Sequence, residues 1–170
     1  MARRRRCLKT KQAMIEAEQR WPDLAGRIEG NRHILPVRVY HEDTDFTGLV
    51  YHANYLKFCE RARSDFVRLS GISQTDLFEG GEEKEAAAFV VRHMDVDYLK
   101  PARMNDVVEV VTSVDHLGGA YMTLLQEVKR DETVLMRLKV KIVLIGASGK
   151  VQRLGALVTG GLQGFVNQES

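Results

Sequence analysis

The 170-residue sequence has few cysteines and no long hydrophobic segment. Its two cysteines, Cys7 and Cys59, lie far apart in unlike surroundings, so they do not predict a disulfide framework. The longest apolar runs, such as residues 86–91 and 142–145, fall far short of the roughly 20 residues of a membrane-spanning helix. These absences predict a protein of a reducing compartment with no transmembrane segment, and we expect it to be cytoplasmic.

The sequence also lacks the common motifs for metals and nucleotides. It contains no CxxC, no HExxH and no group of Cys and His with zinc-ligand spacing. Residues 43–54 begin like an EF-hand loop, but Asn54 stands where a calcium loop needs a bidentate Glu. The glycine-rich segments 146–150 and 160–164 fit neither a P-loop nor a dinucleotide fingerprint. We therefore predict neither a metal site nor a cofactor.

Positive charge is concentrated at the N-terminus. The chain has 25 Lys and Arg against 23 Asp and Glu, and residues 1–11 hold six of the basic residues and no acid. The rest of the chain is therefore mildly acidic. A short basic run can attract nucleic acid or an anionic membrane, but most such runs are simply solvated, so no nucleic-acid partner is expected. We assign residues 1–32 to a basic, partly helical N-terminal extension.

Two elements are predicted at the start of the chain's main body. Residues 36–40 alternate in polarity like a short strand and lead into the turn-rich segment 42–48. Apolar residues then recur at three- and four-residue spacing, which predicts a long helix from near Asn54, a favoured N-cap residue, to a stop at residues 70–71. Cys59 lies on the apolar stripe of this helix, so we expect a core residue rather than a nucleophile.

The second half of the chain predicts an antiparallel sheet. The polar segment 78–85 is expected to form a loop. Beyond it come four strand-like runs, which are residues 88–99, 107–114, 121–129 and 134–145. Short turns between consecutive strands favour antiparallel neighbours. The order of elements predicts an α+β domain over residues 33–155, in which one sheet curls around one helix, and a C-terminal tail over residues 156–170.

The densest group of polar residues, 40–54, lies between the first strand and the start of the long helix. A helix N-terminus presents unpaired N–H groups and the positive end of the macrodipole, and both stabilise an oxygen anion. Gly48 can adopt a positive φ and let the loop direct its amides inward. The segment thus combines the parts of an oxyanion hole with neighbouring acids.

Residues 38–55 (RVYHEDTDFTGLVYHANY) and 58–63 (FCERAR) closely resemble the active-site signature of the 4-hydroxybenzoyl-CoA thioesterase family. Within that family the sequence is most similar to the Tol–Pal-associated (YbgC-type) acyl-CoA thioesterase branch. The resemblance continues through residues 89–94 (FVVRHM) and 98–103 (YLKPAR) and covers roughly residues 36–145. A pattern of this length is far more specific than a lone short motif.

The resemblance implies a hotdog fold, in which a long antiparallel sheet wraps around one central helix. It implies hydrolysis of acyl-CoA, or of an acyl group on acyl carrier protein, to a free acid and a thiol, with no cofactor. It also implies homodimers or homotetramers with active sites at the subunit interface. The Tol–Pal association of the branch implies a place in lipid metabolism, whereas acyl chain length and head group are not determined.

The resemblance assigns the catalytic carboxylate to Asp45, the second acid of the Asp-x-Asp pair. A carboxylate beside a thioester can attack the acyl carbon or deprotonate a water, and the sequence does not choose between a nucleophile and a general base. We expect the oxyanion donors among the backbone amides that follow Gly48, around Val50 and Tyr51 and as far as His52. His52 is also expected to orient the water, carry a proton or bond the substrate carbonyl.

Further residues complete the predicted site. His41 stands where the branch has a tyrosine, so it either substitutes as a hydrogen-bond donor or is an ordinary strand residue. We assign Asn54 to substrate binding, together with Arg92, Lys100 and Arg103, which can pair with the phosphates of CoA unless they are simple surface charges. Asp43 is expected to be a turn or capping acid.

Two other functions remain open at this point. A non-catalytic acyl-CoA sensor or binding module on the same fold is the alternative from a different class, although such a protein has no need for the acid at Asp45. Dehydration of β-hydroxyacyl thioesters is the other, although an Asp-x-Asp loop before the helix is the wrong pattern for it. Both remain alternatives to the acyl-CoA thioesterase.

Overall fold

The computed structural model of the chain describes residues 26–80 and 86–166. Within them the elements are β1 (Arg27–Glu29), β2 (Arg32–Arg38), η2 (His41–Asp43), α2 (His52–Leu69), α3 (Gln74–Glu79), β3 (Ala87–Tyr98), β4 (Val107–Leu117), β5 (Tyr121–Arg130), β6 (Thr133–Gly146), β7 (Val151–Gln152), α4 (Ala156–Leu162) and η3 (Gln163–Phe165).

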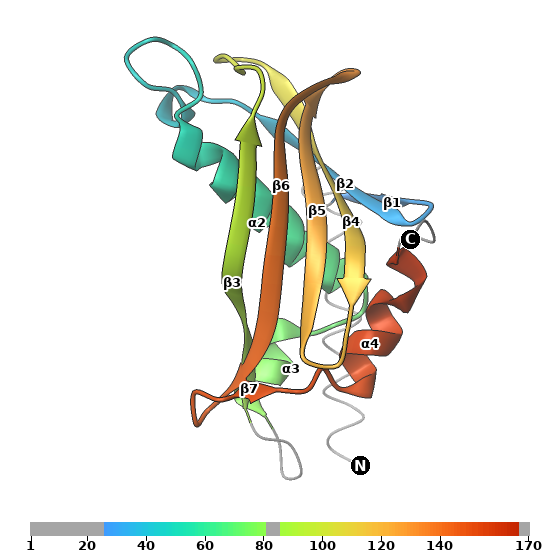
Figure 1. Cartoon of the computed structure of the whole chain (residues 1–170). Helices are drawn as coiled ribbons and strands as arrows, with labels where there is room; N and C mark the ends of the chain where they lie inside the picture. The colour runs from blue at the N-terminus through green and yellow to red at the C-terminus, as the bar shows by residue number, and fades with distance from the viewer. Residues whose placement is uncertain (1–25, 81–85, 167–170) are drawn as a thin grey trace.

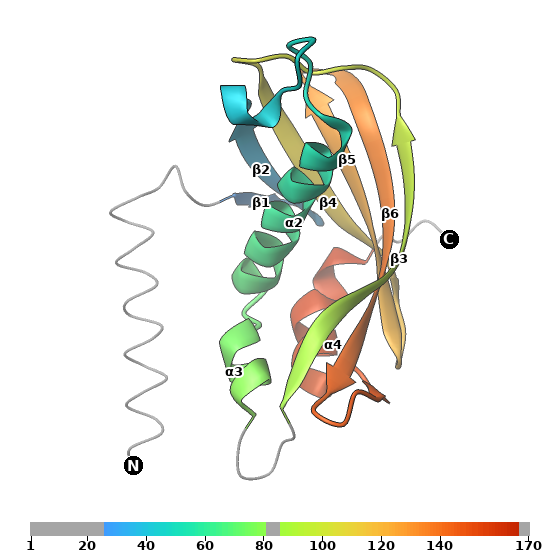
Figure 2. The same cartoon turned by 90° about the vertical axis from the view of Figure 1, so that its left-hand side faces the viewer.

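The strands of the described residues form one antiparallel, seven-stranded sheet. Its order is β1-β2-β4-β5-β6-β3, and β7 pairs with the end of β6 (Figure 1). Helix α2 lies on one face of this sheet, and the strands curve around it (Figure 2). The four strand-like runs of the sequence are β3 to β6, so the predicted α+β hotdog fold is confirmed.

The core lies between α2 and the inner face of the sheet. Phe58, Ala62 and Phe66 of α2 are fully buried at the predicted helical spacing. Alternate residues of each strand face the helix because successive side chains point to opposite faces, as Val108 and Val110 of β4 do. Burial of one such phenylalanine contributes about 1.5–3 kcal/mol, so this stripe holds α2 against the sheet.

A buried polar network crosses the same interface. The Arg63 Nη1 group of α2 donates a hydrogen bond to Oε1 of Gln126 on β5 at 2.8 Å, and the other guanidinium nitrogen pairs with Glu60. Gln126 Nε2 in turn donates to the Cys59 carbonyl and to Thr112 Oγ1, both at 3.0 Å. Buried polar groups are costly unless they are hydrogen-bonded, so this network fixes how α2 is oriented on β4 and β5.

The start of α2 differs from the prediction. The helix begins at His52, after the N-cap residue Tyr51, whose side chain makes no capping hydrogen bond. Asn54, the predicted N-cap, lies inside the first turn and is buried. The predicted end is confirmed, because α2 stops at Leu69 and Gly71 adopts a φ of +80°.

The predicted loop 78–85 is partly helical. Helix α3 extends to Glu79 and begins after Ser73, whose hydroxyl accepts a hydrogen bond from the Asp76 amide. Capping by serine is a local signal that favours a helix here. Residues 81–85 lie outside the described part of the chain.

Elements on both sides of the predicted domain, residues 33–155, contact the sheet and its core. Strand β1, within the segment assigned to the N-terminal extension, pairs with β2 and belongs to the sheet. Helix α4 and η3, within the assigned tail, cover the core with buried Val158 and Leu162, and the Phe165 ring meets the Phe66 ring edge-on at 4.9 Å. The basic residues of the extension lie outside the described residues. No helix in residues 26–80 or 86–166 has the length and apolar character of a membrane span.

Candidate active site

The polar loop before α2 is held in place by Asp43. Its buried side chain accepts a hydrogen bond from the Tyr40 amide at 2.9 Å. Its carbonyl accepts one from the Tyr51 amide at 2.9 Å and another from Asn54 Nδ2 at 3.0 Å. Asp43 therefore ties the loop to the first turn of the helix, which confirms the prediction of a structural acid.

Asp45 lies on a tight turn directly after this anchor. Its Oδ1 atom accepts hydrogen bonds from the Thr47 amide at 2.8 Å and the Thr47 hydroxyl at 2.5 Å, and its carbonyl accepts one from the Gly48 amide at 3.0 Å. Gly48 closes the turn with a φ of +75°, in the region that favours glycine. The bonds from Thr47 lower the pKa of the Asp45 carboxyl group, so this group is ionised at neutral pH.

Both side-chain hydrogen bonds from Thr47 reach the same Asp45 oxygen, Oδ1, and the Leu49 amide also lowers the pKa of this carboxyl group. The Asp45 amide donates to the Leu49 carbonyl at 2.9 Å, and Thr44 forms a bridge with Val50. The loop is thus folded back on itself just before α2. An ionised carboxylate therefore lies next to the start of a helix.

Several backbone amides in the predicted oxyanion site already donate hydrogen bonds to other groups. The Gly48 amide already donates to Asp45, the Val50 amide to the Ala102 carbonyl at 2.9 Å, and the Tyr51 amide to the Asp43 carbonyl. Of the predicted donors, the amides of Val50 and Tyr51 are therefore occupied in this arrangement, whereas Gly48 has the positive φ predicted for it. The amides of His52 and Ala53 begin the helix, lack an intrahelical partner and bond to no other described residue. The first free amide is therefore that of His52, the last residue among the predicted oxyanion donors.

His52 is exposed at the N-terminus of α2 and is surrounded by aromatic rings. The Tyr51 ring centroid lies 4.4 Å away, and the Tyr98 ring lies edge-on at 6.1 Å. The Tyr98 hydroxyl donates a hydrogen bond to the His52 carbonyl at 3.0 Å. Tyr98 is not among the site residues predicted from the sequence, although it is the first residue of segment 98–103, which carries part of the family resemblance.

The other two predicted polar residues behave differently from each other. His41 is exposed in η2, and its ring makes no hydrogen bond within the part of the chain that is described, so its catalytic role stays a prediction. Asn54 is buried and donates to the Asp43 carbonyl. Its side chain thus helps to hold the loop, and its role in substrate binding stays a prediction.

The three basic residues predicted to bind CoA are not equivalent. Arg103 is exposed and bridges Leu49, beside the turn that carries Asp45. Lys100 is exposed two residues beyond Tyr98, at the same end of the sheet. Arg92 lies six residues before Tyr98, about 20 Å along β3, next to an irregularity in its pairing with β6. The structure thus brings Lys100 and Arg103 to the site but not Arg92.

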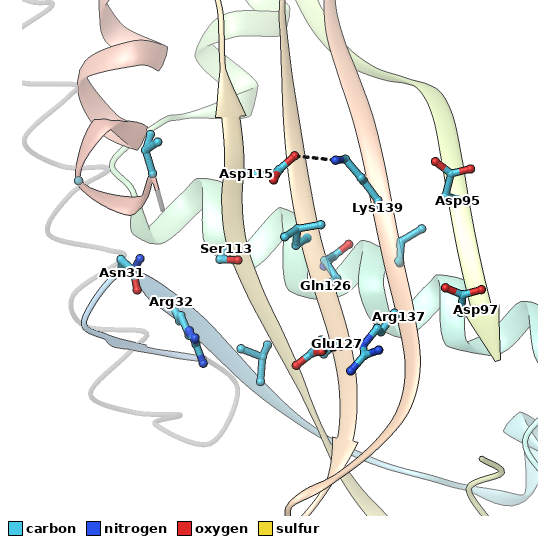
Figure 3. A pocket seen from close by; sticks show the side chains of 15 residues that line it. Asn31, Arg32, Asp95, Asp97, Ser113, Asp115, Gln126, Glu127, Arg137 and Lys139 are labelled. Carbon is cyan, nitrogen blue, oxygen red and sulfur yellow. Dashed lines mark hydrogen bonds and ion pairs between the residues drawn. The ribbon is translucent and has the colours of Figure 1, made fainter. Parts of the chain in front are cut away.

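A broad groove of about 1070 Å³ lies elsewhere, on the outer face of the sheet. Figure 3 shows its charged side chains on the strands with α2 behind them, including the ion pair between Lys139 and Asp115 at 3.0 Å. Arg137 and Glu127 form a second pair across neighbouring strands at 3.1 Å. None of the predicted site residues lines this groove. The described residues also contain no group of three Asp, Glu, His or Cys that is placed to hold a metal.

Comparison with known sequences gives one family. The sequence model of the Thioesterase superfamily matches residues 47–137 and so begins two residues after Asp45. Among curated proteins, the acyl-CoA thioesterase YbgC of Haemophilus influenzae is 38% identical over 115 residues, which are 68% of this chain and 82% of that protein. The acyl-CoA thioester hydrolase YbgC of Escherichia coli O157:H7 is 43% identical over 101 residues, which are 59% of this chain and 72% of that protein.

Comparison with solved structures agrees. A probable thioesterase from Bartonella henselae is similar with a TM-score of 0.69 and 42% identity, over 73% of this chain and 99% of that chain. A 1,4-dihydroxy-2-naphthoyl-CoA thioesterase from Synechocystis, only 21% identical, shares the fold with a TM-score of 0.70 over 78% and 96% of the two chains.

Proposed function

Because the chain belongs to the thioesterase superfamily, we propose that Asp45 is the catalytic carboxylate of an acyl-CoA thioester hydrolase. The YbgC relatives are named acyl-CoA thioesterases or thioester hydrolases, and this chain is likewise an acyl-CoA thioesterase. Its reaction converts an acyl-CoA and water into a free carboxylic acid and CoA.

The observation that carries the role of Asp45 is its placement beside the free amides of α2. The carboxylate is ionised, and Thr47 holds its Oδ1 oxygen with two hydrogen bonds. The amides of His52 and Ala53 present two donors and the positive end of the helix to the same region. A thioester carbonyl bound here has its oxygen stabilised while its carbon faces the carboxylate.

Two routes fit this arrangement. In the first, Asp45 attacks the acyl carbon, the C–S bond breaks and CoA leaves as its thiolate, after which water hydrolyses the acyl–Asp45 anhydride. In the second, Asp45 accepts a proton from a water that attacks the acyl carbon directly. Both routes pass through an oxyanion at the His52 and Ala53 amides, and one such donor is typically worth about 10²–10³ in rate.

The surrounding side chains supply orientation and binding. The exposed His52 imidazole is placed to hold the water or to protonate the departing thiolate. Lys100 and Arg103 are placed to pair with the phosphates of CoA. Acyl carrier protein has a single phosphodiester in place of the several phosphates of CoA. Loss of the two positive charges is therefore expected to impair hydrolysis of acyl-CoA more than hydrolysis of an acyl carrier protein thioester.

We further propose that the enzyme is a cytoplasmic homodimer or homotetramer built through β3. This strand is 12 residues long and lies at the edge of the sheet, where its outer backbone groups have no neighbouring strand in the described part of the chain. Such edges favour pairing with another strand. A two-fold axis pairs β3 with its copy in antiparallel orientation and brings the partner close to the Tyr98 end, where the site lies.

The test is free-thiol release from short, long and aromatic acyl-CoAs and from an acyl carrier protein thioester. Wild type is expected to hydrolyse at least one acyl-CoA, and Asp45→Asn is expected to lose 10² or more in kcat/KM. Asp131→Asn is the matched control, because this exposed Asp lies in the β5–β6 turn with a φ of 52°, which Asn also tolerates. Binding of acyl-CoA without turnover by wild type would instead establish the non-catalytic sensor.

A further inference from the structure

The inner face of β3 carries a row of apolar side chains that α2 covers only in part. Residues of β3 that pair with core residues of β6 face inward, and these are Phe89, Val91, Met94, Val96 and Tyr98. Helix α2 packs against β2, β4 and β5, whereas β3 lies beyond β6 at the edge of the sheet. As a result Val91 is 40% exposed and Tyr98 is 48% exposed. We call this row of five residues the β3 inner strip.

One end of the β3 inner strip lies at the proposed active site. Tyr98 donates its hydroxyl hydrogen to the His52 carbonyl, and its ring meets the His52 ring edge-on. The Tyr55 ring of α2 also packs against the Tyr98 ring at 5.9 Å. The strip is therefore continuous with the place where the thioester carbonyl is proposed to bind.

The other end of the strip opens into a recess between α3 and β3. This recess has a volume of about 340 Å³ and includes Leu77 and Phe78 of α3 with Ala87 and Phe89 of β3. Phe78 is exposed and Leu77 is half-buried. Nine residues separate Phe89 from Tyr98, which is about 30 Å along an extended strand. An apolar path of this length runs from the site to the recess.

The charged residues of β3 that pair with β6 lie on the opposite face. His93, Asp95 and Asp97 pair with Lys141, Lys139 and Arg137 of β6, whose side chains point outward. The inner face is thus apolar while the outer face of the same strand is charged. In a dimer paired through β3, the two strips lie side by side on the same face of the joined sheet, so each supplies a wall for the other.

We propose that the β3 inner strip binds the hydrocarbon chain of the substrate, so that long unbranched acyl-CoAs are preferred over short ones. This inference rests on the proposed function, because it takes the thioester to lie at Asp45 and His52. Each methylene group removed from water strengthens binding about fourfold. A two-carbon acyl group reaches none of the strip below Tyr98, whereas an extended eighteen-carbon chain of about 22 Å spans nearly all of the roughly 23 Å from Tyr98 to Val91.

Two neighbouring valines give a matched pair of variants. Val91 and Val90 are each 40% exposed, but they lie on opposite faces of β3, since Val91 pairs with Ile142 of the core and Val90 pairs with Val143. Val91→Trp is expected to lower kcat/KM for stearoyl-CoA at least tenfold while kcat/KM for acetyl-CoA changes less than twofold. Val90→Trp is expected to leave the ratio of the two substrates as in wild type.

A binding measurement separates this inference from the proposed function. Asp45→Asn is titrated with stearoyl-CoA and acetyl-CoA, alone and combined with Val91→Trp or Val90→Trp. The Val91→Trp combination is expected to weaken binding of stearoyl-CoA at least tenfold and binding of acetyl-CoA not at all. Equal effects of the two tryptophans, or equal losses for both substrates, would overturn the inference even if wild type is an active thioesterase.

Two further outcomes are decisive. If Val91→Trp reduces all activities together and light scattering shows a change of oligomeric state that Val90→Trp lacks, the strip is a contact between copies and the inference is wrong. If Asp45→Asn hydrolyses as fast as wild type, the role of Asp45 fails, while the ratio of kcat/KM values for the two substrates in Val91→Trp and Val90→Trp still tests the strip. A chain-length effect confined to Val91→Trp supports the inference in either case.

Discussion

The Tyr98 hydroxyl donates a hydrogen bond to the His52 carbonyl at 3.0 Å and so joins the end of the edge strand β3 to the first turn of α2. The two residues are 46 positions apart in the chain. Since the proposed oxyanion donors are the amides of His52 and Ala53, this bond fixes the helix end that presents them. Tyr98 is therefore a positioning residue, although it need not touch the reacting atoms.

Tyr98→Phe tests this positioning role. The variant keeps the ring that packs against Tyr55 and removes only the hydroxyl group. The loss of one hydrogen bond is expected to lower the free energy of unfolding by about 0.5–1.5 kcal/mol and to lower kcat more than it raises KM. Thiol-release kinetics and thermal unfolding measure both effects.

Tyr121→Phe is the control for this variant. The Tyr121 ring stacks on His116 and lies under the Lys141 ammonium group, but no hydrogen bond from its hydroxyl group reaches a described residue. Its kcat is expected to equal that of wild type. Equal kcat values for Tyr98→Phe and wild type would show that the bond to His52 is dispensable.

Thr47 is expected to set the pH below which hydrolysis is lost. Its hydroxyl and amide groups lower the pKa of Asp45 below the ordinary value of 3.8, so the carboxylate stays ionised until the pH falls below that value. Thr47→Val removes the largest of these contributions and is expected to move the acid limb of kcat/KM to higher pH, with little change at pH 7. Initial rates between pH 3 and pH 7 measure this shift.

Thr44→Val is the matched control, because the Thr44 hydroxyl donates to the His41 carbonyl and not to Asp45. Its acid limb is expected to coincide with that of wild type. If both variants shift the limb equally, the shift reports general damage to the loop rather than the ionisation of Asp45.

Acid stability is expected to depend on Asp65 of α2. Its carboxylate accepts hydrogen bonds from the Gly26 amide at 2.7 Å, from buried His33 at 2.8 Å and from Arg68 at 2.7 Å. Burial raises the pKa of Asp65, but the bonds from His33, Arg68 and Gly26 outweigh it and hold the value at about 2. The ionised form is thus favoured by folding.

The sign of the effect follows from this lowered pKa. Asp65 stabilises the fold fully above its unfolded pKa near 3.8, and this contribution disappears as the pH falls towards 2. Asp65→Asn is expected to cost about 2 kcal/mol at pH 7 and to flatten the dependence of stability on pH between 4 and 2. Urea unfolding at several pH values measures this, and a variant as stable as wild type at pH 7 would refute it.

The elements that the sequence predicts well are those with local signals. The apolar stripe of α2 and the alternation of β3 to β6 depend on neighbouring residues, so both could be recognised from spacing. Asp43 could be recognised as a structural acid because it lies in a turn before a helix. Asp45 could be identified only from a family pattern, and its ionised carboxylate close to the start of α2 agrees with that choice.

The features that were missed depend on contacts between distant segments. The Val50 amide is occupied by the carbonyl of Ala102, 52 residues away, and no local pattern reveals that partner. Asn54 is a favoured capping residue, yet its amide group bonds to the Asp43 carbonyl from inside the helix. Helix α4 becomes part of the fold only because Val158 and Leu162 reach the core, since its own sequence is short and rich in glycine.

The most direct test of the central claim is a single-turnover measurement with enzyme in excess over lauroyl-CoA. This measurement isolates the cleavage of the thioester from the release of products. If Asp45 is the catalytic carboxylate, Asp45→Asn binds lauroyl-CoA as tightly as wild type and cleaves it at least 10²-fold more slowly. Equal rate constants for cleavage in the two proteins would contradict the account.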